Sequence, residues 1–198
     1  MSKKMLNTII GAIIGFLSSI LTVIVGRWLD KVGKLKIYFK IINTSSEQTG
    51  WGMMKGNQGK YFSVPVLYQI QNVSNTTRVI RDISILLYDG NHFLKKMTQI
   101  NYTEHNRTSG GKVISVEKEY FGTEAGSYSF VIPPRSINTF KCLYVLNTAQ
   151  VTELSDKHFD NLKIRYFDER DKAKVFNARA IFNTEVTQDV DDDWTLLK

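Results

Sequence analysis

The chain has 198 residues, of which 26 are basic and 19 acidic, so its formal net charge is +7. Residues 1–36 hold six basic residues and one acidic residue, so the positive excess belongs mainly to one end and does not indicate a nucleic-acid partner. One cysteine, Cys142, excludes an internal disulfide, which small extracellular domains often need, and its apolar neighbours predict a buried thiol.

Residues 5–26 carry no charged side chain and lie between Lys4 and Arg27. As a helix rising about 1.5 Å per residue, this stretch matches a hydrocarbon core of about 30 Å. A cleaved secretory signal is the alternative, but its apolar region is normally about 7 to 15 residues and ends at a small-residue cleavage motif that is absent here. The sequence therefore predicts a retained transmembrane helix over residues 5–28.

Four residues at the C-terminal end of this span are typical of a membrane interface: Arg27, Trp28, Lys31 and Lys34. Tryptophan favours the headgroup level, and long basic side chains reach up to it. Residues 27–40 hold five basic residues, against Lys3, Lys4 and the α-amino group before the span. Because positive charge accumulates on the cytoplasmic side, we expect a single-pass protein of the cell membrane with a cytoplasmic domain.

Glycosylation sequons favour the opposite orientation, because they would accept glycans in a secreted eukaryotic domain. They begin at Asn43, Asn72, Asn75, Asn101 and Asn106. A chain rich in Asn, Ser and Thr also contains such triplets by chance, and the lack of a disulfide agrees with that interpretation.

Small residues recur every four positions within the span, at Gly11, Gly15 and Ser19. They form a ridge on one helix face, which allows two helix backbones to approach closely. Two interpretations stay open. The ridge packs against a second copy or a partner's membrane helix, or it reflects the general frequency of glycine in membrane helices.

Beyond residue 34 the pattern changes to the alternation that is typical of half-buried strands. Apolar runs of this kind cover residues 35–41, 64–70, 83–87, 128–132, 140–146, 162–166 and 175–182. Only residues 148–159 favour a short helix. Eight or nine strands without alternating helices predict an all-β fold, an antiparallel β-sandwich that is immunoglobulin-like or related, after one N-terminal transmembrane helix.

These patterns divide the chain into five parts. They are a short N-terminal tail (1–4), the transmembrane helix (5–28), a basic juxtamembrane connector (29–34), the β-sandwich domain (35–188) and an acidic C-terminal tail (189–198). The connector is short, so the domain must lie close to the bilayer. We expect the tail to be solvated, although Trp194, Leu196 and Leu197 offer apolar anchors for docking.

Two long connections stand out among the expected strands. Residues 44–60 carry Trp51, Met53 and Met54, which are aromatic and flexible apolar side chains of the kind found at binding surfaces. They make a candidate partner-binding loop, and the alternative is that they fold back as a lid on the core. Residues 101–112 are polar and are expected to form a second loop.

No motif for catalysis or metal binding stands out. His92, His105 and His158 fall in separate segments without other ligands at zinc spacing. The acidic residues of the 168–171 turn suit a hard cation, but acids at turns are usually only solvated. We therefore predict no catalytic residues, no metal and no cofactor.

In outline the layout resembles small bacterial single-span proteins that present a β-sandwich to a partner. We expect an interaction or scaffold module at the inner face of a bacterial membrane that contacts membrane lipid. It would form a homo-oligomer or bind a partner membrane protein, and not nucleic acid. The alternative is a ligand-sensing membrane effector, in which a small molecule binds the domain and clustered helices disturb the membrane.

The first prediction concerns the anchor. Alkaline carbonate and high salt release proteins held by charge, whereas a spanning helix keeps its apolar side chains in lipid. We expect the full-length protein to stay in the membrane pellet after both washes, as followed by immunoblotting. Release into the supernatant would contradict the anchor.

Overall fold

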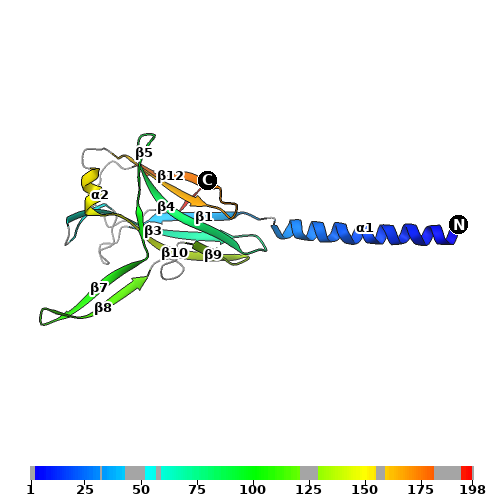
Figure 1. The fold of residues 1–198 in the computed structure, drawn as a ribbon, viewed down its shortest axis with the longest axis horizontal. Helices are drawn as coiled ribbons and strands as arrows, with labels where there is room; N and C mark the ends of the chain where they lie inside the picture. The colour runs from blue at the N-terminus through cyan, green and yellow to red at the C-terminus, as the bar shows by residue number, and fades with distance from the viewer. Residues whose placement is uncertain are drawn as a thin grey trace.

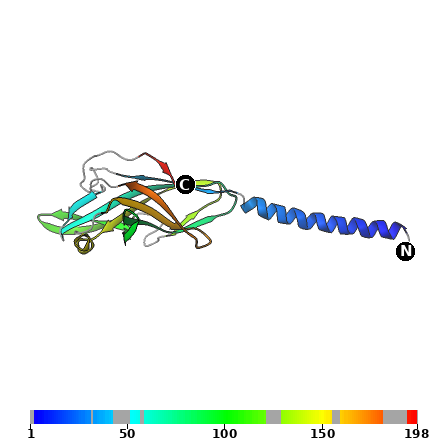
Figure 2. The same cartoon turned by 90° about the horizontal axis from the view of Figure 1, so that it is seen from above.

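The computed structural model describes residues 3–31, 33–42, 52–56, 59–120, 129–154, 159–180 and 193–197. An antiparallel β-domain occupies one end of the molecule, and the helix α1 (Lys3–Lys31) leaves it along the long axis (Figures 1 and 2). The predicted fold class, an all-β sandwich after one apolar helix, is confirmed.

Two sheets make up the body of the domain. The first has the order β13–β1–β3–β10–β6, with β2 also paired to β3, and the second has the order β12–β11–β4–β5, with β9 also paired to β4. The strands of the first sheet are β1 (Leu35–Ile41), β2 (Gly52–Gly56), β3 (Gly59–Asn72), β6 (Thr98–Ile100), β10 (Ser136–Leu146) and β13 (Thr195–Leu196). Those of the second are β4 (Arg78–Asp89), β5 (His92–Lys96), β9 (Ser129–Ile132), β11 (Asn161–Phe167) and β12 (Ala173–Ala180).

A third, two-stranded sheet stands apart from this body. It pairs β7 (Tyr102–Ser109) with β8 (Lys112–Tyr120), and we call it the ribbon. Figure 1 shows the ribbon projecting from the domain at the end away from α1. All nine side chains of β8 are exposed.

The core lies between the two large sheets. Alternate side chains of β3 and β10 point inward from one sheet, and those of β4 and β11 from the other. The sheets meet at Phe130 and Phe140, whose rings lie edge to face with centroids 4.9 Å apart. They also meet where the Tyr144 hydroxyl donates to the Ile83 carbonyl over 2.9 Å. This packing removes the apolar face of each sheet from water.

One irregularity adjusts the pattern of β4. Ile80 and Ile83 are both fully buried although they lie three residues apart, not two. Asp82 between them has a φ of 48°, and the pairing with β11 shifts register here. An extra residue therefore bulges from β4 and restores the inward alternation.

Cys142 is confirmed as a core thiol. It has no exposed surface, and burial raises the pKa of its thiol to about 12. At neutral pH the group is therefore protonated, and it is shielded from reagents in the folded protein.

The short helix predicted over residues 148–159 is confirmed over its first six residues. The helix α2 (Thr148–Glu153) starts with a capping box, in which Asn147 accepts from the Gln150 N–H and donates its own N–H to the Gln150 side chain. Part of the expected extension, at residues 155–158, lies outside the described residues.

Three expectations for the connections differ from the structure. Residues 52–56 and 59–60, expected in a loop, form β2 and the start of β3. The expected loop over residues 101–112 contains β7 and begins β8. At the C-terminus, β13 pairs with β1, and the Leu197 N–H donates to the Ile37 carbonyl over 2.9 Å. In each case pairing with a neighbouring strand satisfies backbone groups of a segment with little hydrophobic pattern of its own.

Candidate functional site

The helix α1 has the length and composition to cross a membrane. Its apolar stretch, Asn7–Leu29, has a mean hydropathy of 2.5 and is not buried against the domain. A signal sequence near an N-terminus has the same properties. Among the described residues this is the one helix of that kind.

The small-residue ridge lies open on this helix. A side chain added at Gly11 or Gly15 would meet nothing within 4 Å. The Ser19 hydroxyl donates to the Gly15 carbonyl over 2.8 Å. The hydroxyl is thus satisfied within its own helix, so this face can lie in an apolar surrounding.

The expected membrane-interface residues lie between the small-residue ridge and the domain. Trp28 is 65% exposed, and Arg27 and Lys34 are also exposed. Lys31 is the last residue of α1, and its side chain is outside the described part of the structure. The chain then enters the domain through Gly33.

Gly33 packs against the turn between β3 and β4. It has a φ of 140°, and a Cβ placed there would lie 2.6 Å from the Ser74 Cα atom. Both the backbone conformation and the close approach require glycine. The chain that leaves the helix is therefore packed on the domain at its first described residue.

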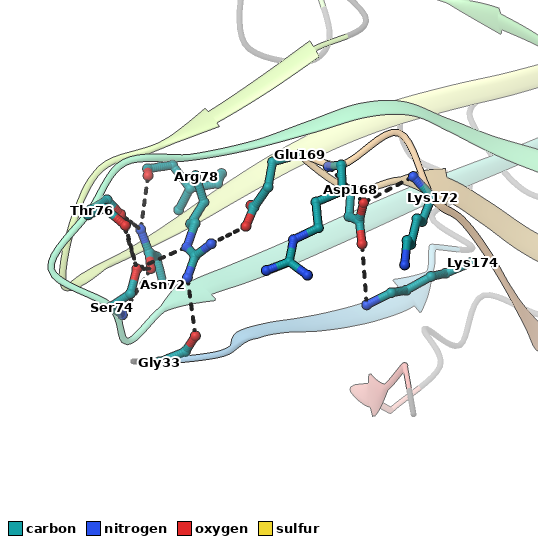
Figure 3. A network of polar contacts seen from close by, with 11 residues as sticks. Gly33, Asn72, Ser74, Thr76, Arg78, Asp168, Glu169, Lys172 and Lys174 are labelled. Carbon is teal, nitrogen blue, oxygen red and sulfur yellow. Dashed lines mark hydrogen bonds and ion pairs between the residues drawn. The ribbon is translucent and has the colours of Figure 1, made fainter. Parts of the chain in front are cut away.

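A network around Asn72 organises this end of the sandwich (Figure 3). The Asn72 side chain is 1% exposed, and its amide nitrogen donates to three carbonyls, those of Thr76, Ile132 and Pro133, over 2.9, 3.1 and 2.9 Å. Its oxygen accepts from the Ser74 N–H and hydroxyl over 3.0 and 2.7 Å. One amide thus joins the β3–β4 turn to the β9–β10 turn.

Arg78 extends the network to the connector that follows α1 and to the β11–β12 turn. Its Nε donates to the Ser74 hydroxyl over 3.1 Å, and its guanidinium donates to the Gly33 carbonyl over 3.4 Å. The same guanidinium forms an ion pair with Glu169 in the β11–β12 turn. Arg78 therefore connects three segments that are far apart in sequence (Figure 3).

Asp168 shapes the β11–β12 turn. Its carboxylate accepts from the Arg170 and Lys172 N–H groups over 2.9 and 3.1 Å, and Lys174 lies 3.8 Å away. Partial burial raises the pKa of Asp168, but the Lys172 and Arg170 N–H bonds and the nearby positive charges outweigh it and hold the pKa below its usual value.

The acids of this turn do not gather around a common point. Glu169 is paired with Arg78, Asp171 with Arg81, and Asp168 with backbone N–H groups. Within the described residues no three His, Cys, Asp or Glu side chains form a group that could hold a metal ion.

The proposed partner-binding residues lie on and beside β2. Met53 is partly buried against the core, and the Met54 sulfur accepts from the Tyr61 hydroxyl over 3.7 Å. Trp51 lies outside the described residues. The structure does not bring this group to the Asn72 network.

The ribbon is the feature that sequence reasoning missed. Tyr120 and Val116 share one face of β8 with Lys118 between them, and Tyr102 on β7 pairs with Tyr120. Ile114 is the extra residue where the pairing shifts register between Val113 and Ser115. The side chains of Tyr120, Val116, Ile114 and Tyr102 are 53, 52, 66 and 39% exposed. Gly110 and Gly111, with φ of 56° and 77°, make the tight turn that ends the ribbon.

The other ribbon face carries ion pairs. Arg107 lies 3.0 Å from Glu117, and His105 lies 3.4 Å from Glu119. Glu119 is also 3.5 Å from Lys141 on β10, which connects the ribbon base to the body. One face of the ribbon therefore carries these ion pairs, and the opposite face combines exposed apolar side chains with the Lys118–Glu104 ion pair of 3.3 Å.

Two of the glycosylation sequons are unsuited to accept glycans. Asn72 and Asn101 are 1% and 5% exposed. A transferase needs the side-chain amide in solvent, so these triplets agree with chance occurrence. Asn75 and Asn106 are exposed, and Asn43 lies outside the described residues.

Comparison with known proteins finds no matching family model and no matching curated protein.

The second prediction tests the Asn72 network. Replacing Asn72 by alanine leaves buried carbonyls and the Ser74 N–H without their partner, so we expect the domain to lose about 2–3 kcal/mol of stability. Thermal melting of the full-length protein in detergent, followed by circular dichroism, measures the loss. The matched control is Asn75→Ala in the same turn, where the side chain is exposed and a near-parental melting temperature is expected. Equal melting of the two variants would contradict the assigned role.

Proposed function

We propose that this protein is a single-span, membrane-anchored interaction module at the inner face of a bacterial membrane, which holds a protein partner through its ribbon. The observation that carries the proposal is the set of exposed apolar side chains on the ribbon, Tyr102, Ile114, Val116 and Tyr120, which lie beside the Lys118–Glu104 ion pair. Exposed apolar side chains bordered by polar groups are a feature of protein-interaction sites.

The position of the ribbon supports this role. It projects at the end of the domain away from α1, so an anchored protein would present it away from the bilayer (Figure 1). Both of its strands are sheet edges within the described residues, because β7 and β8 pair only with each other. Free strand edges offer backbone donors and acceptors to a partner strand.

The ribbon also gains from a partner in energetic terms. An isolated two-stranded hairpin is marginal in water, and exposed ion pairs such as Arg107–Glu117 contribute at most about 1 kcal/mol. A partner that covers these exposed apolar side chains would remove them from water and stabilise the ribbon.

The proposal also gives roles to the helix α1 as an anchor and to its small-residue ridge as a packing surface. The exposed helix would hold the domain at the membrane, and the open face at Gly11, Gly15 and Ser19 would allow a second copy of α1 to pack closely. Two copies would then present two ribbons.

The third prediction tests the ribbon in living cells. A photocrosslinking amino acid at Ile114 should give one discrete protein adduct, and adding Val116→Ser should abolish it because an exposed apolar contact of the ribbon is lost. The matched control places the crosslinker at Val175 on β12, which is 48% exposed and lies off the ribbon. Gel electrophoresis and mass spectrometry measure the adducts. The proposal is wrong if Ile114 gives no adduct, or the same adducts as Val175.

The fourth prediction concerns orientation. A cysteine at Ser109, next to the exposed ribbon turn, should resist a membrane-impermeant maleimide in intact cells and react after lysis. The parent chain is the control, since buried Cys142, with its pKa near 12, should stay unlabelled in the folded protein. Labelling of Ser109→Cys in intact cells would place the domain on the outer side.

A further inference from the structure

A hollow opens where the helix connector meets the β11–β12 turn, with a volume of about 630 Å³. We call it the membrane-proximal hollow. The connector and β1 supply Gly33, Lys34 and Leu35, and β4 supplies Arg78. The remaining lining comes from residues 166–174, at the end of β11 and the start of β12 (Figure 3).

Positive charge dominates this hollow. Five basic and two acidic side chains line it, an excess of three positive charges: Lys34, Arg78, Arg170, Lys172 and Lys174, against Asp168 and Glu169. The two acids are already engaged, Asp168 by backbone N–H groups and Glu169 by Arg78.

Three of the cations remain available to a ligand. Within the described residues the structure gives Lys34, Arg170 and Lys172 no ion pair. The Asp168 carboxylate accepts hydrogen bonds from the backbone N–H groups of Arg170 and Lys172, so these bonds hold the turn without using the two side chains. The positive charge of Arg170 is close enough to help lower the pKa of Asp168. The domain thus presents a preformed cationic turn beside an exposed lysine.

The location of the hollow next to α1 favours a ligand that comes from the membrane. The apolar stretch of α1 ends at Leu29, and four residues lead from there to Gly33. With two of these residues helical, that distance is at most about 10 Å. The headgroup layer on each side of a bilayer is about 5–8 Å thick. A domain anchored by α1 would therefore hold the hollow at the outer boundary of the headgroup layer, within reach of its long basic side chains.

We propose that the membrane-proximal hollow binds the phosphate-bearing headgroup of an anionic phospholipid. Phosphate oxygens accept charge-assisted hydrogen bonds from lysine and from the planar arginine fork. Basic pockets on the cytoplasmic side of membrane helices select anionic headgroups in the same way. The inference rests on the membrane anchor of the proposed function and is independent of the ribbon.

The experiment uses the full-length protein in detergent micelles. Native mass spectrometry counts bound lipid as phosphatidylglycerol or phosphatidylcholine with the same acyl chains is added. We expect a preference for phosphatidylglycerol in the parent. The double variant Arg170→Gln, Lys172→Gln should weaken its binding about thirtyfold and leave the binding of phosphatidylcholine unchanged. The fold should persist, because the substitutions keep the backbone N–H groups that hold Asp168.

The matched control, Arg107→Gln with Lys112→Gln, also removes two positive charges, but from the ribbon, and it should bind phosphatidylglycerol as the parent does. Three results would overturn the inference: no preference in the parent, an equal loss in the control, or displacement of phosphatidylglycerol by millimolar inorganic phosphate, which would indicate a site for free phosphate. Failure of the anchor is distinguishable, since it appears as release by alkaline carbonate, while headgroup binding in micelles is measured separately.

Discussion

The hydrogen bonding of the buried Asn72 amide is the interaction on which the end of the domain next to α1 depends. The amide makes five hydrogen bonds, to the β3–β4 turn and to the end of β9 and Pro133. Buried polar groups need partners, so one side chain with this many partners leaves the turns little freedom to rearrange. Ser74, which is hydrogen-bonded to Asn72, also accepts a hydrogen bond from Arg78 and packs against Gly33. The path from helix to domain is therefore a packed junction.

This junction gives the two ends of the domain different chemistry. Next to α1, turns from both sheets gather polar and basic groups around Arg78 and Asp168 (Figure 3). At the far end the ribbon exposes apolar side chains that the body does not cover. This separation would suit the proposed anchor at one end and the proposed docking surface at the other, because charge favours a headgroup layer whereas apolar area favours a protein partner.

The elements that the sequence predicted well are those whose side chains face the core. The alternation in β1, β10 and β11 survives in the structure because each buried face forces a period of two. The sequence predicts a loop over residues 101–112, which include β7, and no strand over residues 113–120, because the apolar residues of the ribbon contact no core. Its one strong sequence signal is the pair Gly110 and Gly111, whose positive φ angles suit a two-residue hairpin turn. Likewise, β13 has only two residues, too few to show a period.

The sequence by itself determined the apolar helix, its basic flank, the all-β class and the burial of Cys142, because each depends on composition or on local periodicity. Only the tertiary structure decided that Asn72 is a buried junction, that Arg78 reaches Glu169 across 91 positions, and that the basic residues of the β11–β12 turn lie beside Lys34. Polar side chains carry no periodic signal, and their partners are set by the pairing of distant strands. The sequence shows which groups are present, and the fold brings them together.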